Sequence, residues 1–67
     1  MDYIEEARIW FYGLGGQMLY LDGSVEIRGS LVHVRYQETE LKDDGVNSTP
    51  RLFVFPLVRL HQIKANA

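Results

Sequence analysis

Basic and imidazole side chains are the residues of this sequence best suited to bind an anion. His33 and Arg35 alternate along one extended segment, so both side chains are expected on one face, about 7 Å apart. They could hold a phosphate or flank a stacked base, with Tyr36 or Tyr20 as the stacking ring. The alternative is an ordinary solvated strand face, with acidic side chains opposite the basic ones.

A second pair with the same spacing, Arg59 and His61, lies close to Pro56 near the C-terminus. The two side chains point to the same side if the last strand begins at Arg59. They form either a positively charged site or the solubilising face of a short strand, and the sequence favours neither.

Residues for covalent, metal or cofactor chemistry are not found in a suitable pattern. The chain has no cysteine and two histidines, too few for a convincing zinc site. The glycines at 13–16 match no phosphate-binding motif, and no serine has triad partners in evident reach. The acidic pairs at 38/40 and 43/44 are expected to solubilise an edge strand and a loop. We therefore predict a non-enzymatic protein without metal or cofactor.

The length of the chain favours self-association. Sixty-seven residues form one domain, 1–67, and a chain this short is marginally stable by itself. Disulfides are excluded, whereas 46% hydrophobic residues exceed what one small core needs. A homo-oligomer is the expected remedy.

Charge is distributed unevenly along the chain. Residues 1–27 carry five acids and one arginine, a sum of −4, and residues 28–67 carry six bases and four acids, a sum of +2. Acidic residues interrupt the N-terminus before a signal peptide can form, and no apolar run approaches the roughly 20 residues that span a bilayer. A cytoplasmic protein without membrane contact is predicted.

A helix is predicted over residues 3–13. Asp2 with Glu5 resembles a capping pair, and the apolar residues of this segment fall within about a third of a helical wheel. Glycines at 13–16 would end the helix. A strand is the alternative, because Ile9–Tyr12 has high β propensity.

Three short strands are predicted next, over 17–22, 24–29 and 31–41. Asp22-Gly23 and Gly29-Ser30 are typical of tight turns between them. In the third strand, Val32, Val34 and Tyr36 alternate with His33 and Arg35, which indicates one buried and one exposed face.

The C-terminal third is predicted to hold an exposed loop, 42–50, and two strands, 51–55 and 60–65. Pro56 cannot continue a central ladder, so a 3₁₀ turn is expected at 56–59. Leu52 and Val54 are expected to face the core, with Phe53 and Phe55 on the opposite side.

The chain resembles the Sm/LSm family in three places. Leu21-Asp22-Gly23 and Gly29-Ser30-Leu31 are similar to the Leu-x-Gly and Gly-x-Leu of the first family motif, and residues 53–63 to the layout of the second. The resemblance implies a mainly β fold, in which a short N-terminal helix precedes a five-stranded, strongly bent SH3-like barrel.

The resemblance also implies partners. Sm-like proteins form rings by pairing the fourth strand of one subunit with the fifth strand of the next, which would place Phe53, Phe55 and Leu57 at the interface. Single-stranded RNA is the implied ligand, with Arg59 and His61 lining the pore and His33, Arg35 and Tyr36 as further candidates. The family's Asp and Asn base contacts have no counterpart here. The alternative is an SH3-like adaptor that binds a protein through the exposed aromatic residues Trp10, Tyr12, Tyr20 or Phe53.

Overall fold

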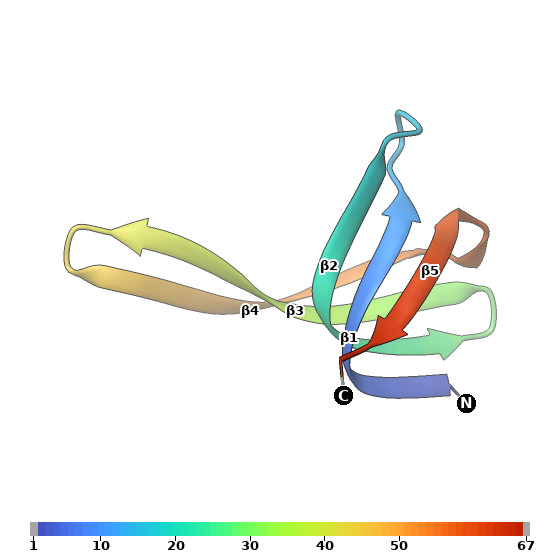
Figure 1. Ribbon diagram of the computed structural model, residues 1–67, viewed down its shortest axis with the longest axis horizontal. Coiled ribbons are helices and arrows are strands. Elements are labelled where there is room, and N and C mark those ends of the chain that lie inside the picture. Colours follow the sequence, from blue (N-terminus) through green and yellow to red (C-terminus); the bar gives the residue numbers. More distant parts are fainter. Residues whose placement is uncertain (1, 67) are drawn as a thin grey trace.

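The computed structural model describes residues 2–66 as one antiparallel sheet of five strands (Figure 1). The ends of the predicted domain, Met1 and Ala67, lie outside the described residues. In spatial order the strands run β4-β3-β2-β1-β5. Their bounds are Asp2–Tyr12 (β1), Met18–Arg28 (β2), Leu31–Lys42 (β3), Gly45–Pro56 (β4) and Leu60–Ala65 (β5), with a 3₁₀ turn, η1, at Leu57–Arg59.

The predicted N-terminal helix is wrong: this segment is strand β1. Ile4 pairs with Val25 but Ala7 pairs with Gly23, so Glu5 and Glu6 together oppose a single residue of β2. This bulge shifts the inward-facing positions of β1 from even to odd residues. As a result, the inward-facing residues Ile4 and Ala7 are three positions apart, which is also the spacing on one face of a helix.

The predicted turn at Asp22-Gly23 is also wrong, because both residues lie within the continuous strand β2. Gly23 is needed for space. A Cβ atom at this position would overlap the backbone carbonyl oxygen of Arg35 on β3. The other predicted turn, at Gly29-Ser30, is confirmed: it joins β2 to β3, and Gly29 has a φ of +59°. A positive φ at the first central residue suits a two-residue hairpin.

Most of the predicted loop 42–50 belongs to a long hairpin. Strands β3 and β4 pair without a register shift from Leu31↔Pro56 to Lys42↔Gly45, and only Asp43 and Asp44 form the turn. We call residues 37–50 the arm. The arm extends away from the body of the molecule (Figure 1). The whole molecule, arm included, measures 41 × 28 × 19 Å.

The turn before the last strand is confirmed. Pro56 ends β4, and the 3₁₀ turn Leu57–Arg59 leads into β5 at Leu60. The Leu57 amide donates to the Ser30 carbonyl over 2.8 Å, which fixes the start of this turn to the β2–β3 hairpin.

The core lies on one side of the sheet, which we call the inner face. The predicted alternation in β3 is confirmed, since Val32 and Val34 are buried. The prediction for β4 is wrong: Phe55 is 1% exposed and Phe53 packs against the core, whereas Leu52 and Val54 lie on the outer face, 50% and 40% exposed. The fully buried set within residues 2–66 is Ala7, Ile9, Phe11, Val25, Val32, Val34 and Phe55.

Aromatic packing explains why β4 turns its phenylalanines inward. The Phe55 ring stacks on Phe11 with centroids 4.6 Å apart, and Phe53 lies 5.4 Å from the same ring. Leucine and valine at 52 and 54 could not form this contact. The order of types along β4 gave no sign of it, because both faces are apolar.

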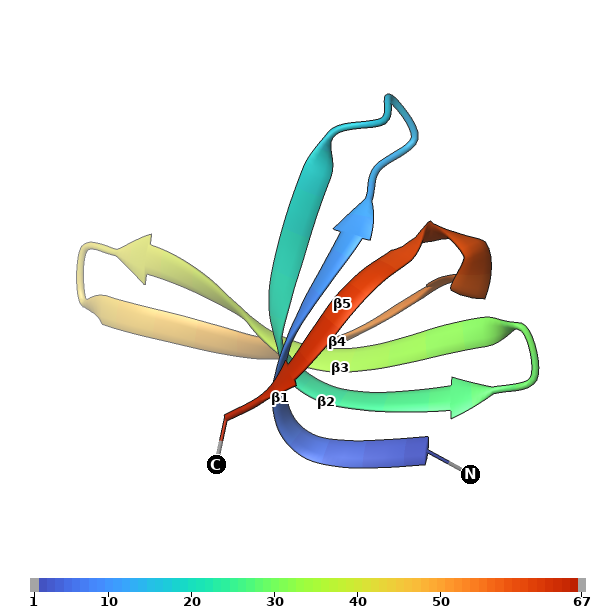
Figure 2. The same cartoon turned by 45° about the vertical axis from the view of Figure 1, so that its right-hand side comes forward.

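The sheet bends strongly, as Figure 2 shows, and its N-terminal strand changes direction near the bulge. Within residues 2–66 no ladder joins β4 to β5, the two ends of the strand order. Both strands therefore have an open edge.

Candidate binding surfaces

The structure separates the first group of predicted ligand residues. His33 and Arg35 lie on the outer face of β3, where His33 pairs with Glu26 and Arg35 with Ser24. Tyr36 faces inward and packs against the core. Tyr36 thus lies on the opposite face of β3 from His33 and Arg35, although it lines one hollow together with Arg35.

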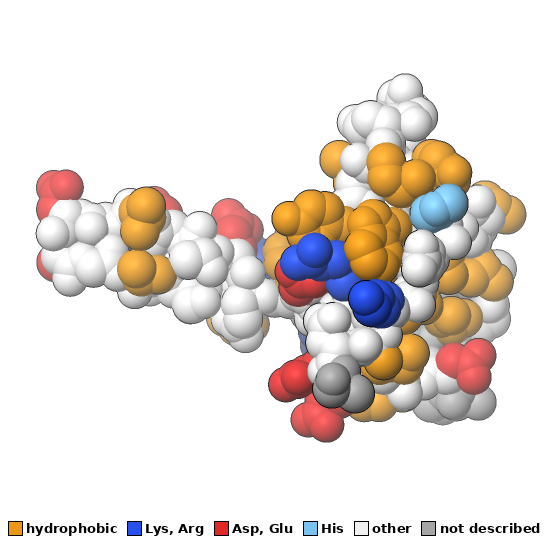
Figure 3. All heavy atoms as spheres, in the orientation of Figure 1, with side chains coloured by type: hydrophobic (Ala, Val, Ile, Leu, Met, Phe, Trp, Pro, Cys, Tyr) orange, Lys and Arg blue, Asp and Glu red, His pale blue; other side chains and the backbone are white. Residues whose placement is uncertain are grey.

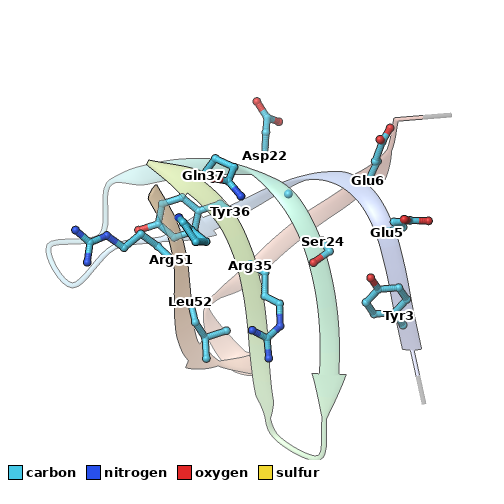
Figure 4. A pocket seen from close by; sticks show the side chains of 12 residues that line it. Tyr3, Glu5, Glu6, Asp22, Ser24, Arg35, Tyr36, Gln37, Arg51 and Leu52 are labelled. Carbon is cyan, nitrogen blue, oxygen red and sulfur yellow. The ribbon is translucent and has the colours of Figure 1, made fainter. Parts of the chain in front are cut away.

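A polar hollow of about 690 Å³ lies where the arm leaves the body (Figure 4). Arg35 and Arg51 line it from the β3–β4 side, and Glu5 and Glu6 line it from the bulge of β1. Arg51 is bound to Glu38, with Nε 2.9 Å from the carboxylate. Charges of both signs across one open hollow favour no single class of ligand.

The second predicted pair converges on an aromatic ring. His61 Nδ1 lies 3.3 Å from the Tyr12 hydroxyl, and the His61 ring meets the Tyr12 ring edge-on at 5.6 Å. Arg59 Nε donates to the Tyr12 backbone carbonyl over 2.7 Å. The Tyr12–Arg59–His61 cluster thus joins a guanidinium, an imidazole and an exposed ring at one end of β1. The sequence placed Arg59 and His61 together but not beside Tyr12.

A second aromatic surface was not predicted as a unit. Trp10 pairs with Tyr20 of β2 and with Gln62 of β5, on the outer face. Arg8 lies next to them, its guanidinium 4.5 Å from the centre of the Tyr20 ring, and pairs with Lys64 of β5. We call Arg8, Trp10, Tyr20 and Lys64 the aromatic face. If residues 8–11 are taken as a strand, the alternation of Arg8 and Trp10 with Ile9 and Phe11 places Arg8 and Trp10 together on one face.

Figure 3 shows this surface from outside, with hydrophobic side chains gathered over β1 and β2 beside lysine and arginine. The Arg8 guanidinium also binds the Asp22 carboxylate. Hydrogen bonding to Arg8 lowers the pKa of Asp22 below its usual range, and the same bond raises the pKa of Arg8. Arg8 is therefore a fixed positive charge.

On the inner face, an apolar hollow of about 360 Å³ lies between the β1–β2 hairpin and β4. Leu19, Leu21, Phe53 and Arg59 are among the residues that line it.

The predicted interface residues differ in accessibility. Phe55 is buried within the chain and Phe53 is half-buried, whereas Leu57 is exposed. Phe55 is thus a core residue and cannot contact a partner from this position. Outside the arm, the exposed apolar side chains of β4 include Leu52 and Val54, and within the arm they include Val46.

Free backbone N–H groups at the open edge of β4 are limited by two prolines. Proline has no N–H, so Pro50 and Pro56 must direct their nitrogens away from β3. Residues at even spacing share that direction, which leaves the amides of Leu52 and Val54 free at the edge. Two amides between two prolines can pair with a short strand only.

Among residues 2–66, no cluster of three or more potential ligand side chains could hold a metal ion. Over the same span, we find no helix with the length and apolar character needed to cross a bilayer.

No family model, curated protein or solved structure matches this chain. The fold therefore defines the class by itself: a small, all-antiparallel β protein with two open edges and an outward hairpin arm.

Proposed function

We propose that this chain is a non-enzymatic, Sm-like module that assembles edge to edge into a homo-oligomeric ring and binds single-stranded RNA. The strand order and the 3₁₀ turn between the last two strands support the proposal, since both fit a strongly bent SH3-like barrel. Pairing of β4 with β5 of the next copy would complete each barrel wall.

The observation that carries this proposal is the incomplete burial of the isolated chain. Its accessible surface is 5020 Å², whereas a monomer of this mass typically exposes about 4,400 Å². Its radius of gyration is 13.0 Å, against about 11 Å for a compact chain of this length. Open edges on β4 and β5 supply complementary backbone groups, and repeated rotation would close a ring.

The RNA part of the proposal is supported by the Tyr12–Arg59–His61 cluster. An exposed ring beside a guanidinium suits a stacked base and its phosphate. A ring of copies would repeat this cluster around one axis and concentrate its positive charge.

Substitutions at Leu52 test the edge pairing. Leu52→Pro removes one outward amide at a position equivalent to Pro50 and Pro56, and Leu52→Ala removes the same side chain but keeps the amide. By light scattering, we expect the wild type and Leu52→Ala to have the mass of a closed ring, whereas Leu52→Pro should fold but not reach that mass. A wild type that is monomeric at tens of micromolar would overturn the proposal.

The aromatic face favours a second candidate function, an adaptor that binds a different protein. Trp10 and Tyr20 lie together on the outer face, away from the core. An apolar contact of this kind weakens little as salt rises, unlike a contact with a polyanion. A stable monomer with no RNA affinity at low salt would favour the adaptor.

A further inference from the structure

The arm has an apolar side that no residue among 2–66 covers. Leu41 and Val46 are cross-strand partners, so their side chains lie on the same face near the tip. They are 83% and 66% exposed. By strand alternation this is the outer face, which continues through Pro50 to Leu52 and Val54. The inner face of the arm is polar, with Glu40 paired to Asn47.

The arm is also strongly acidic. Residues 37–50 contain four carboxylates, Glu38, Glu40, Asp43 and Asp44, and one cation, Lys42, which gives a charge of −3. Glu38 pairs with Arg51. The ion pairs found within residues 2–66 do not include the other three carboxylates. Figure 3 shows acidic side chains at the end of the arm and hydrophobic ones next to them, nearer the body.

The aromatic face has the complementary properties. Trp10 and Tyr20 supply apolar area, and Arg8, Lys64 and Asp22 give it a charge of +1. The basic residues Arg59 and His61 lie next to it, at Tyr12. Lys64 forms no ion pair among the described residues.

The arm cannot reach the aromatic face of its own chain. It is held by the β3–β4 ladder and points away from the body (Figures 1 and 3). We propose that the arm of one copy docks on the aromatic face of a second copy, with Leu41 and Val46 against Trp10 and Tyr20. The inference rests on the self-assembly part of the proposed function, to which it adds a second contact.

Each copy carries one arm and one aromatic face, so the contact is heterologous and repeats from copy to copy. Like edge pairing, it would cover part of the surface, roughly 600 Å², that the isolated chain exposes in excess of a compact monomer. Acidic side chains around the arm tip and basic ones around the aromatic face would set the orientation and exclude the reverse pairing.

Two double variants separate the halves of the contact. The arm variant is Leu41→Thr/Val46→Thr, and the face variant is Tyr20→Thr/Lys64→Glu. All four positions are exposed, and threonine keeps the β propensity of the strands. Both variants leave the backbone edges of β4 and β5 unchanged. The control is Asn47→Thr, on the inner face of the same arm.

We expect each double variant to raise the concentration for half-association by at least about tenfold, as measured by sedimentation velocity, whereas Asn47→Thr resembles the wild type. An equal mixture of the two variants should then associate at a lower concentration than either variant alone, because one has an intact face and the other an intact arm. Each mixed pair can form one arm–face contact, and the edges of β4 and β5 stay available for pairing.

Wild-type association by both double variants would overturn the inference and leave edge pairing intact. A mixture that associates no more readily than its two components would also overturn it. An unchanged oligomeric mass of Leu52→Pro, together with dissociation of the arm and face variants, would instead refute edge pairing alone. Capture of RNA or of a different protein by the aromatic face of a monomeric chain would overturn the inference as well.

Discussion

Arg8 holds the Asp22 carboxylate with two hydrogen bonds, from Nε at 2.8 Å and from Nη2 at 3.0 Å. The pair joins β1 to β2 at directly opposed positions, next to Gly23, where β3 comes close. The Tyr20 ring lies beneath the same guanidinium. One arginine therefore orders the acid, the ring and the strand pairing of the aromatic face.

The first prediction concerns the pH dependence of this pair. Because the pKa of folded Asp22 is lowered, mainly by the bond from Arg8, its contribution to stability is present above the ordinary carboxyl pKa. It is lost as the pH falls through the lowered pKa. Asp22→Asn should thus destabilise the chain slightly at neutral pH, since the pair is exposed, and the difference from wild type should vanish in acid.

Urea unfolding between about pH 6 and about pH 2 measures this difference. Asp43→Asn, at the tip of the arm, is the control and should leave the stability profile close to that of wild type. A difference between Asp22→Asn and wild type that stays constant down to the acid limit would contradict the assignment.

The second prediction concerns the close approach of β2 and β3. Gly23→Ala should destabilise the fold by about 1–3 kcal/mol, because the new methyl group must displace the Arg35 carbonyl. Gly15→Ala is the control, since it meets only the flexible Gln17 side chain, and should change stability by less than about 0.5 kcal/mol. Equal stabilities of the two variants in urea would refute this role of Gly23.

The third prediction concerns the orientation of β4. Phe55→Ala removes a buried ring that stacks on Phe11, so we expect a loss of about 3–5 kcal/mol. Val54→Ala, one residue away on the outer face, should cost less than about 1 kcal/mol. Thermal unfolding followed by circular dichroism compares them, and the opposite ranking would mean that β4 turns its other face inward.

Phe55→Leu keeps the outcome measurable if Phe55→Ala does not fold. Leucine retains most of the apolar volume, so the expected loss is less than about 1.5 kcal/mol.

The fourth prediction concerns RNA. Arg59→Glu should weaken binding of a single-stranded oligonucleotide at least about tenfold, and each lost phosphate contact should reduce the salt slope by about 0.7. Lys42→Glu makes the same charge change in the arm, away from Tyr12, and should affect binding less. Fluorescence anisotropy at low and high salt measures both, and equal affinities would exclude the Tyr12–Arg59–His61 cluster as the site.

The faces of β3 and the turn before β5 could be predicted from the sequence, because strand alternation and a single proline determine them without reference to a neighbouring strand. Val32 to Tyr36 alternate without interruption, and Pro56 places the 3₁₀ turn and β5 within a residue or so of their observed positions. Local rules suffice there because each depends on one strand.

The errors arose where a neighbouring strand decides the conformation. The bulge at Glu5–Glu6 gives Ile4 and Ala7 a helical spacing, and only the register with β2 reveals it. Gly23 serves the approach of β3, which no local pattern records. In the arm, Lys42 and residues 45–50 belong to strands because their backbones pair, although nothing apolar is buried there.

The binding surfaces follow the same distinction between features set within one segment and features set by strand pairing. Arg59 and His61 are close in the chain, so their common site was visible in the sequence. Tyr12 joins them across the β1–β5 ladder, and Trp10 meets Tyr20 across β1–β2. Those neighbours follow from strand pairing, which the helix prediction excluded.

Since the arm holds none of the buried residues, its length can change without affecting the core. Removing two residues from each strand would shorten its reach by about 7 Å and keep each side chain on its present face. Removing one from each strand would shorten it by about 3.4 Å and turn the polar side outward. The arm is thus a spacer whose length changes in steps of one residue pair. Arms of different length could hold two copies at different distances while the body of each copy stays the same.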